Sequence, residues 1–335
     1  MSTASTRAVA ALTPGPVDAP DSFREIDLPL APLGPHDLLV EVRAVSVNPV
    51  DTKRRTGFDA ADGPLVLGYD AAGIVVEAGQ DVRSFSVGDE VWYAGSIARP
   101  GSNADRQVVD ERIVGRKPSS LTFAEAAAMP LTTITAWEAL FERLRVTSTD
   151  TGTLLVMGGG GGTGTMMIQL ARQLTGLTVI ATASRDASRT LADDMGAHRV
   201  IDHRGLGDEL TRVAPDGLDY VFSNHSAGNI ETYAEHLKVR GAVVAIDDAS
   251  GLDMTPFKRK SQTWMWEYMF TEPLYAPEGA TQHALLSRAA DLVDRGVLRT
   301  NITETLSPLN ADTIREAHAM VETGSMVGKV VVERV

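Results

Sequence analysis

The residues Leu154-Leu-Val-Met-Gly-Gly-Gly-Gly-Gly-Thr-Gly164 decide the fold of this chain. The apolar residues predict a short buried strand, and the glycines after them fit the pattern Gly159-x-Gly161-x-x-Gly164. In that pattern the first glycine permits a tight turn, the second lets the backbone approach a pyrophosphate, and the third lets a helix pack on the strand. We expect the helix to begin near Thr163, so that its positive end faces the phosphates. The stretch predicts a dinucleotide site that includes Gly159, Gly161, Gly162, Thr163 and Gly164.

Further strand-like runs follow the glycines, and helical stretches separate them. This alternation argues against a flexible glycine linker, and it predicts a parallel sheet with helices on both faces. The helix after the glycines carries an apolar stripe, as a helix that packs on a sheet requires. We therefore expect an α/β fold with a Rossmann domain, a doubly wound parallel sheet, over residues 130–274. Its later strands are expected near residues 179–182, 199–201, 219–222 and 242–246.

The end of the second strand bears on the choice of cofactor. An NAD site places Asp or Glu there to accept a hydrogen bond from the ribose 2′-hydroxyl, whereas this strand ends in Ala183-Ser184-Arg185. A hydroxyl residue beside an arginine suits a charged 2′-phosphate, so Ser184 and Arg185 favour NADPH. Asp186 leaves an alternative, because it could accept from the ribose. We expect it instead to cap a helix that begins at Ala187.

The sequence on either side of this region has a different pattern. Residues 1–129 are mostly short strands and turns, with prolines concentrated near the start. Residues 275–335 add two amphipathic stretches, near 280–295 and 312–323, and a final strand from Lys329 to Glu333. A chain of 335 residues exceeds what one hydrophobic core usually supports, so we expect two domains.

Composition excludes several classes of function. The net charge of -13 and the lack of a long basic run give no attraction to nucleic acid or to anionic lipid. No segment approaches the roughly 18 apolar residues of a membrane span, and we expect a cytoplasmic protein. The chain has no cysteine, and its seven histidines show no metal-binding spacing. We therefore expect no metal site.

Several motifs extend along nearly the whole chain. They are Asn48-Pro-Val-Asp51, Leu67-Gly-Tyr-Asp-Ala-Ala-Gly73, Val87-Gly-Asp-Glu-Val91, the run 129–137, the glycine stretch and Gly328-Lys-Val330. Together they resemble the zinc-free, quinone-oxidoreductase-like branch of the medium-chain dehydrogenase/reductase superfamily. Trp266-Glu-Tyr-Met-Phe270 is similar to a sub-branch named zinc-type alcohol dehydrogenase-like. The resemblance implies a GroES-like, β-rich catalytic domain made of residues 1–129 and 275–335, with the Rossmann domain inserted between them.

The resemblance also bears on metal binding. Zinc-dependent relatives hold the catalytic metal with two cysteines and a histidine, and the matching positions here are Asn48, Tyr69 and Leu131. The region that matches the structural zinc lobe, near 94–105, is short and has no cysteine. Without a Lewis acid, oxidation of a saturated alcohol is disfavoured, because its alkoxide charge is localised. Hydride addition to a quinone or enone delocalises the charge, so that hydrogen-bond donors can hold it.

The resemblance suggests three catalytic donors in a substrate cleft between the domains: Asn48, Lys53 and Tyr69. Each of them has a structural alternative. Asn48 could form a turn before Pro49, and Lys53 could be an ordinary surface lysine. Tyr69 could be a core aromatic residue. We expect Asp51 to hold the loop in place rather than to transfer a proton.

The same resemblance places further residues at the cofactor. It puts His203 beside the adenosine phosphate, and Thr135 and Lys329 near the nicotinamide. An exposed loop residue would also explain His203, and a surface lysine beside the last strand would also explain Lys329. The cofactor contacts beyond the glycine turn therefore rest on likeness to relatives rather than on spacing.

Two functions remain as hypotheses. One is an NADPH-dependent reductase of quinones or enones, and the other is an NADPH-binding redox sensor or structural protein with little turnover. An alcohol dehydrogenase with an adventitious metal is a third, weaker interpretation. The resemblance further implies a homodimer, in which residues 263–270 form the last Rossmann strand and pair with a second copy. Alternatively, the aromatic residues of this segment line the substrate pocket of a monomer.

Overall fold

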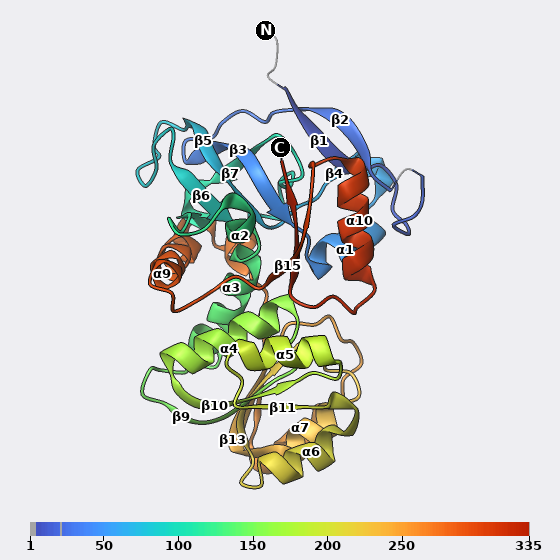
Figure 1. Cartoon of the computed structure of the whole chain (residues 1–335), viewed down its shortest axis with the longest axis vertical. Coiled ribbons are helices and arrows are strands. Elements are labelled where there is room, and N and C mark those ends of the chain that lie inside the picture. The colour runs from blue at the N-terminus through green and yellow to red at the C-terminus, as the bar shows by residue number, and fades with distance from the viewer. Residues whose placement is uncertain (1–4, 21, 335) are drawn as a thin grey trace. The chain divides into compact units, whose positions relative to one another are not determined.

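The computed structural model describes residues 5–20 and 22–334, which form two compact units (Figure 1). One unit holds the residues up to Leu131 together with those from Phe270 onward, and the other runs from Thr132 to Met269. The sequence pattern predicts the two domain boundaries between residues 129 and 130 and between residues 274 and 275. Among the described residues, every helix is too short or too polar to span a bilayer.

The unit from Thr132 to Met269, described throughout, is built on a six-stranded sheet. Its order is β11-β10-β9-β12-β13-β14, and every neighbouring pair is parallel. This is the strand order of a dinucleotide-binding Rossmann sheet, in which the direction of winding reverses between β9 and β12. The strands are β9 (Thr151–Val156), β10 (Gly176–Thr182), β11 (Arg199–Ile201), β12 (Leu218–Ser223), β13 (Leu237–Ala245) and β14 (Thr263–Trp266).

Helices cover both faces of this sheet because the chain winds in two directions. Parallel crossovers are right-handed, so the path β9, β10, β11 puts its helices on one face, and the return to β12 and β13 puts the next helices on the other. Figure 1 shows α4 beside α5 and α6 beside α7. The expected doubly wound Rossmann domain is confirmed. Its helices are α4 (Gly162–Leu174), α5 (Asp186–Asp194), α6 (Leu206–Val213) and α7 (Ile230–His236), and α3 (Pro130–Trp137) leads into it through a π-helical turn, Glu138–Arg143.

Two local expectations in this unit are wrong. The helix expected from Ala187 begins at Asp186, so Asp186 lies within the first turn and Arg185 precedes it. The strand expected over residues 263–270 ends at Trp266, because the chain leaves the sheet there to cross to the other unit. Met269 and Phe270 are 4% and 2% exposed, so they are core residues and not part of an edge that a second copy could pair with.

The other unit is β-rich, as expected for a GroES-like domain. Within the described residues it has a three-stranded sheet, β2-β1-β4, and a seven-stranded sheet, β15-β16-β3-β5-β6-β8 with β7 also paired to β3. The last strand completes the larger sheet, since Val331 of β16 lies opposite Ser46 of β3. Its strands are β1 (Ser5–Ala11), β2 (Arg24–Pro29), β3 (Asp37–Ser46), β4 (Leu65–Val66), β5 (Ala71–Ala78), β6 (Glu90–Tyr93), β7 (Arg106–Asp110), β8 (Val114–Arg116), β15 (Ile302–Leu306) and β16 (Lys329–Glu333).

Short helices connect and flank these sheets. Asn48 precedes the first of them, and Pro49 begins it, where the missing N–H of proline costs no helical hydrogen bond. The two amphipathic stretches near the end of the chain are helical, as expected. The helices are α1 (Pro49–Gly57), α2 (Phe123–Ala127), α8 (Thr271–Tyr275), α9 (Gln282–Asp294) and α10 (Ala311–Glu322).

A buried arginine and a buried histidine lie where α1 packs on α10. Arg55 is 0% exposed, donates to the Gly15 carbonyl at 2.7 Å and pairs with Glu322. His318 is also 0% exposed, and its ring meets that of Phe23 edge-on, with centroids 4.6 Å apart. Burial, and secondarily the charge of Arg55, lowers the pKa of His318 to about 3. The imidazole is therefore neutral in the folded protein near pH 7.

His318 should make the fold less stable in mild acid. Its folded pKa lies below the value near 6.5 of an unfolded chain, so only the unfolded chain takes up a proton between about pH 6.5 and 3. Stability is therefore lost as the pH falls through this window. Between pH 7.5 and 5.0, the free energy of unfolding should fall by about 2 kcal/mol more for wild type than for His318→Leu. Urea unfolding at both pH values measures this difference, and equal losses would contradict it.

Candidate active site

Three polar side chains from distant parts of the chain meet inside the β-rich unit. Lys329, the first residue of β16, is 4% exposed. Its Nζ donates to Asn48 Oδ1 at 2.5 Å and to Asp70 Oδ2 at 2.9 Å. Asn48 Nδ2 donates to the same Asp70 oxygen at 2.8 Å. The amide, the carboxylate and the ammonium thus form a closed, buried network.

A second buried carboxyl group, Asp51, holds the loop that carries this network. Asp51 lies in the first turn of α1, where one carboxylate oxygen accepts from the Asn48 backbone N–H at 2.8 Å and the other from the Gly68 N–H at 2.9 Å. Burial raises the pKa of Asp51 to about 7, although these hydrogen bonds and the charge of Lys329 oppose the rise. Burial also raises the pKa of Asp70, and the charge of Lys329 is the strongest of the effects that oppose this rise. The ion pair is between Lys329 and Asp70, whose atoms lie 2.9 Å apart, and Asp51 is the carboxyl group with a pKa of about 7.

The other two candidate donors have different surroundings. Tyr69 is 1% exposed, and its ring packs edge-on against Phe270 at a centroid distance of 5.4 Å. The guanidinium of Arg54 lies 5.8 Å from the centre of the Tyr69 ring. Lys53, in contrast, is exposed on α1. The structure therefore brings Asn48 and Lys329 together, places Tyr69 beside Asp70 along the chain, and leaves Lys53 at the surface.

Sequence reasoning did not single out Asp70, and it allowed a surface position for Lys329. Asp70 is a carboxylate in a nearly apolar run, Leu65–Val76, and an acidic residue in such a run needs a partner when it is buried. That signal identifies a buried charge. The partner lies 259 positions away along the chain, so no local pattern could name it.

The predicted dinucleotide site has the expected backbone geometry. Gly158 has a φ of 69°, and its N–H donates to Thr182 Oγ1 at 2.9 Å. A Cβ atom on Gly164 would lie 2.2 Å from the Gly158 carbonyl oxygen, so only glycine lets the helix begin so close to the turn. The turn and the N-terminus of α4, which begins at Gly162, fit a pyrophosphate. Gly159, Gly161, Gly162, Thr163 and Gly164 all lie in this turn or in the first turn of α4.

Three of the other predicted cofactor residues follow neighbouring strands. Ser184 and Arg185 lie between β10 and α5, and His203 comes just after β11. Because β9, β10 and β11 are parallel neighbours, all of these residues lie at the carboxyl edge of one sheet. Arg185 is exposed and the His203 side chain is 50% exposed. Thr135 lies within α3 and is 6% exposed.

The residues at the positions that hold zinc in relatives do not fit a metal ion. Leu131 has no ligand atom in its side chain, and the Asn48 side-chain oxygen already accepts from the cationic Lys329. Among residues 5–20 and 22–334, no group of three or more His, Cys, Asp or Glu side chains could hold a metal ion. A cation placed at Asn48 would meet the ammonium of Lys329.

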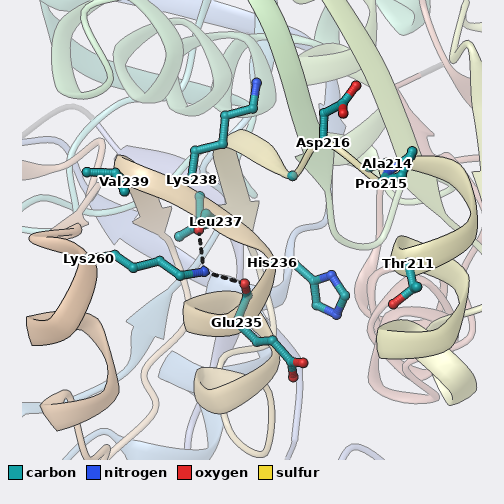
Figure 2. Close-up of a pocket in the computed structure, with 11 residues that line it drawn as sticks. Thr211, Ala214, Pro215, Asp216, Glu235, His236, Leu237, Lys238, Val239 and Lys260 are labelled. Atoms are coloured by element: carbon teal, nitrogen blue, oxygen red, sulfur yellow. Dashed lines mark hydrogen bonds between the residues drawn. The ribbon is translucent and has the colours of Figure 1, made fainter.

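A groove of about 680 Å³ lies at the opposite edge of the Rossmann sheet, at the amino ends of β12 and β13. Figure 2 shows Lys260 donating to the Glu235 and Leu237 carbonyl oxygens, at 2.5 and 2.9 Å. Lys238 pairs with Asp219 at 2.7 Å. These lysines already have partners, and ligands of open α/β sheets bind at the carboxyl edge instead.

Two family comparisons cover most of the chain. The family described as Alcohol dehydrogenase GroES-like domain matches residues 34–138, and the family described as Zinc-binding dehydrogenase matches residues 195–332. A zinc-type alcohol dehydrogenase-like protein of Staphylococcus epidermidis is 34% identical over 324 residues, which cover 94% of this chain and 96% of its own. A solved structure from Rhizobium etli, provisionally described as a zinc-dependent alcohol dehydrogenase, is 46% identical, covers 99% of both chains and has a TM-score of 0.94.

Two further relatives have names that state a reaction. The NADPH-dependent alkenal/one oxidoreductase of Arabidopsis thaliana is 30% identical over 304 residues, 88% of this chain and 71% of its own. The quinone oxidoreductase of Coxiella burnetii is 26% identical, covers 99% of this chain and 100% of its own, and has a TM-score of 0.83. Fold and relatives together define an oxidoreductase of the type that binds nicotinamide cofactors. The chain belongs to the medium-chain dehydrogenase/reductase superfamily, as a quinone-oxidoreductase-like member.

Removal of the Lys329 charge should destabilise the β-rich unit. Lys329→Met leaves Asp70 buried without its cation, and breaking a buried pair in this way typically costs about 3 to 5 kcal/mol. The double variant Lys329→Met/Asp70→Asn should recover much of this loss, because it buries no unpaired charge. Lys53→Met, at an exposed site, should change the free energy of unfolding by less than about 0.5 kcal/mol. Urea unfolding of wild type and these three variants tests the pair, and a double variant that is as unstable as Lys329→Met, or less stable, would refute it.

Proposed function

We propose that this protein is an NADPH-dependent, zinc-independent oxidoreductase that transfers hydride to a quinone or to an α,β-unsaturated carbonyl compound. The observation that carries the proposal is the closed network of Asn48, Asp70 and Lys329. It provides fixed hydrogen-bonding groups where zinc-dependent relatives hold a metal. The names of the Arabidopsis and Coxiella relatives support the same two acceptor classes.

The chemistry of the acceptor agrees with this donor set. NADPH, when bound, supplies a hydride. A quinone that gains this hydride and one proton becomes a hydroquinone, and an enone becomes a saturated carbonyl compound. The negative charge in either reaction is spread over a conjugated system, so it does not require a Lewis acid. Oxidation of a saturated alcohol would require stabilisation of the localised charge of an alkoxide. The side chains of Asn48 and Leu131 offer no set of metal ligands for that purpose.

The side chains have proposed roles that follow from their surroundings. Lys329 and Asp70 hold the Asn48 amide in one orientation, and the buried Tyr69 is a hydroxyl donor in a dry environment. Lys53 remains a weaker candidate donor, because it is exposed on α1. Catalysis would then depend mainly on the positioning of the hydride donor and its acceptor.

The choice of NADPH rests on the residues after β10. Ser184 and the exposed Arg185 offer a hydroxyl group and a positive charge where NAD-specific sites carry an acid. Thr135 and His203 are proposed as further cofactor contacts.

We also propose a cytoplasmic homodimer that pairs through β14, where Trp266 is 45% exposed, as is Tyr268 just beyond the strand.

The purified protein should oxidise NADPH when a quinone or an enone is added. Stopped-flow absorbance with a panel of both classes and with saturated alcohols measures this. Turnover should be confined to the conjugated acceptors, and dialysis against a chelator should leave the rate unchanged. A protein that binds NADPH but leaves every acceptor unreduced would instead be the redox sensor or structural protein considered above.

Arg185 should determine the preference between the two cofactors. A charge-assisted contact to the 2′-phosphate is typically worth about 1.5 to 3 kcal/mol, so Arg185→Ala should weaken NADPH binding by roughly 10- to 100-fold and leave NADH nearly unchanged. Arg212→Ala is a matched control, because Arg212 pairs with Glu209 on α6 at 2.6 Å. Fluorescence titration gives both dissociation constants. Equal weakening of NADPH and NADH by Arg185→Ala would show that the residue supports the fold.

A further inference from the structure

A second polar network lies at the carboxyl ends of β12 and β13. Asp247, just beyond β13, accepts from the Ser226 backbone N–H at 2.7 Å and from Ser226 Oγ at 2.6 Å. Ser223 Oγ, at the end of β12, lies 3.2 Å from Ser226 Oγ and 3.0 Å from the Tyr233 hydroxyl. Ser223, Ser226 and Tyr233 are each 0% exposed. The network thus joins two strand ends to α7 in the interior of the Rossmann unit.

This network fixes the loop over residues 224–229, which connects β12 to α7. The Tyr233 hydroxyl donates to the His225 carbonyl oxygen at 3.1 Å, and Asn229 Nδ2 donates to the same oxygen at 2.9 Å. Asp247 holds the next residue, Ser226, by both its backbone and its side chain. Buried polar networks favour one conformation when each member is hydrogen-bonded. The loop is therefore anchored at two consecutive residues.

The anchored loop reaches the glycine turn. A Cβ atom built on Gly158 would lie 2.2 Å from Asn224 Nδ2, so the Asn224 side chain lies against the first glycine of the turn. Strand β12 adjoins β9, at the point where the winding of the sheet reverses. Dinucleotides bind across this point. Ser184 and Arg185 follow β10 on one side of β9, so the loop lies on the side toward which the nicotinamide half would extend.

We propose that Asp247 is a positioning residue for the nicotinamide half of the cofactor. Through Ser226 it holds the loop so that Asn224 contacts this half beside Gly158. This inference rests on the proposed function, because it takes a nicotinamide dinucleotide as the ligand. Binding of the adenosine half would depend instead on the residues that follow β10 and β11. Release of the loop should therefore weaken the binding of the whole dinucleotide but not of its adenosine part.

The test compares two ligands that differ in the nicotinamide half. NADPH and adenosine 2′,5′-bisphosphate are titrated against wild type, Asp247→Ala and Asn224→Ala, and dissociation constants are measured by fluorescence and calorimetry. Each variant should bind NADPH about tenfold more weakly, as expected for the loss of about one hydrogen bond. Both should bind the bisphosphate as wild type does. The double variant should be no weaker than either single variant, because the two residues act through one contact.

Asp219, on β12, provides a matched control for Asp247. Its carboxylate also accepts from a backbone N–H, that of Thr153 at 2.8 Å, and from a side chain, Lys238 at 2.7 Å. It lies at the amino end of β12, and its partner Lys238 lines the groove in Figure 2. Asp219→Ala should lower the thermal unfolding temperature and leave both dissociation constants unchanged. If Asp247→Ala does not fold, Asp247→Asn replaces it in the test. The asparagine keeps one acceptor oxygen, so this variant should weaken NADPH binding in the same way but by a smaller factor.

The possible results separate the two proposals. Wild-type protein that binds neither ligand would overturn the proposed function, and this inference with it. Wild-type protein that binds NADPH, with Asp247 variants that bind it equally well, would overturn the inference alone. Equal weakening of both ligands would also overturn it, because a general disturbance of the Rossmann unit does not distinguish the two halves of the cofactor.

Discussion

The ion pair between Lys329 and Asp70 is the interaction on which the β-rich unit depends. Asp70 is fully buried, and an isolated carboxylate in such a place would be strongly disfavoured. The ammonium that neutralises it comes from the first residue of β16, so the charge is balanced only when this strand lies beside β3. The orientation of Asn48 follows, because its amide is held by both members of the pair. One electrostatic requirement thus fixes a strand, a loop and a candidate catalytic group.

The Rossmann unit obeys a different constraint, which is the direction of its strands. All six run parallel, so the residues that end them collect at one edge. The glycine turn, Arg185 and the Asp247 network all lie at this edge. At the opposite edge, Lys238 pairs with Asp219, and Lys260 donates to backbone carbonyl oxygens. The topology alone therefore assigns ligand chemistry to one end of the sheet.

The sequence predicted those features that local patterns control. The glycine turn, the alternation of strands and helices, and the last strand all follow from spacing over a few residues. The pairing of Lys329 with Asp70 did not, because it joins residues far apart in the sequence, and the bond between Asp247 and Ser226 likewise joins the ends of two strands. The end of β14 at Trp266 was also missed, since the following aromatic and apolar residues suit a strand equally well. They turn away because the chain crosses there to the other unit.

The position of β16 has a consequence for the order of folding. The Rossmann unit is encoded without interruption, so a ribosome delivers all of its strands before β16 emerges. Strand β3 is made early, but it can pair with β16 only after the end of the chain has been synthesised. During that interval Asp70 has no ammonium beside it, and the Asn48 amide has no fixed direction. The candidate active site is therefore completed last, so a prematurely terminated chain would have a Rossmann fold but an incomplete network around Asn48.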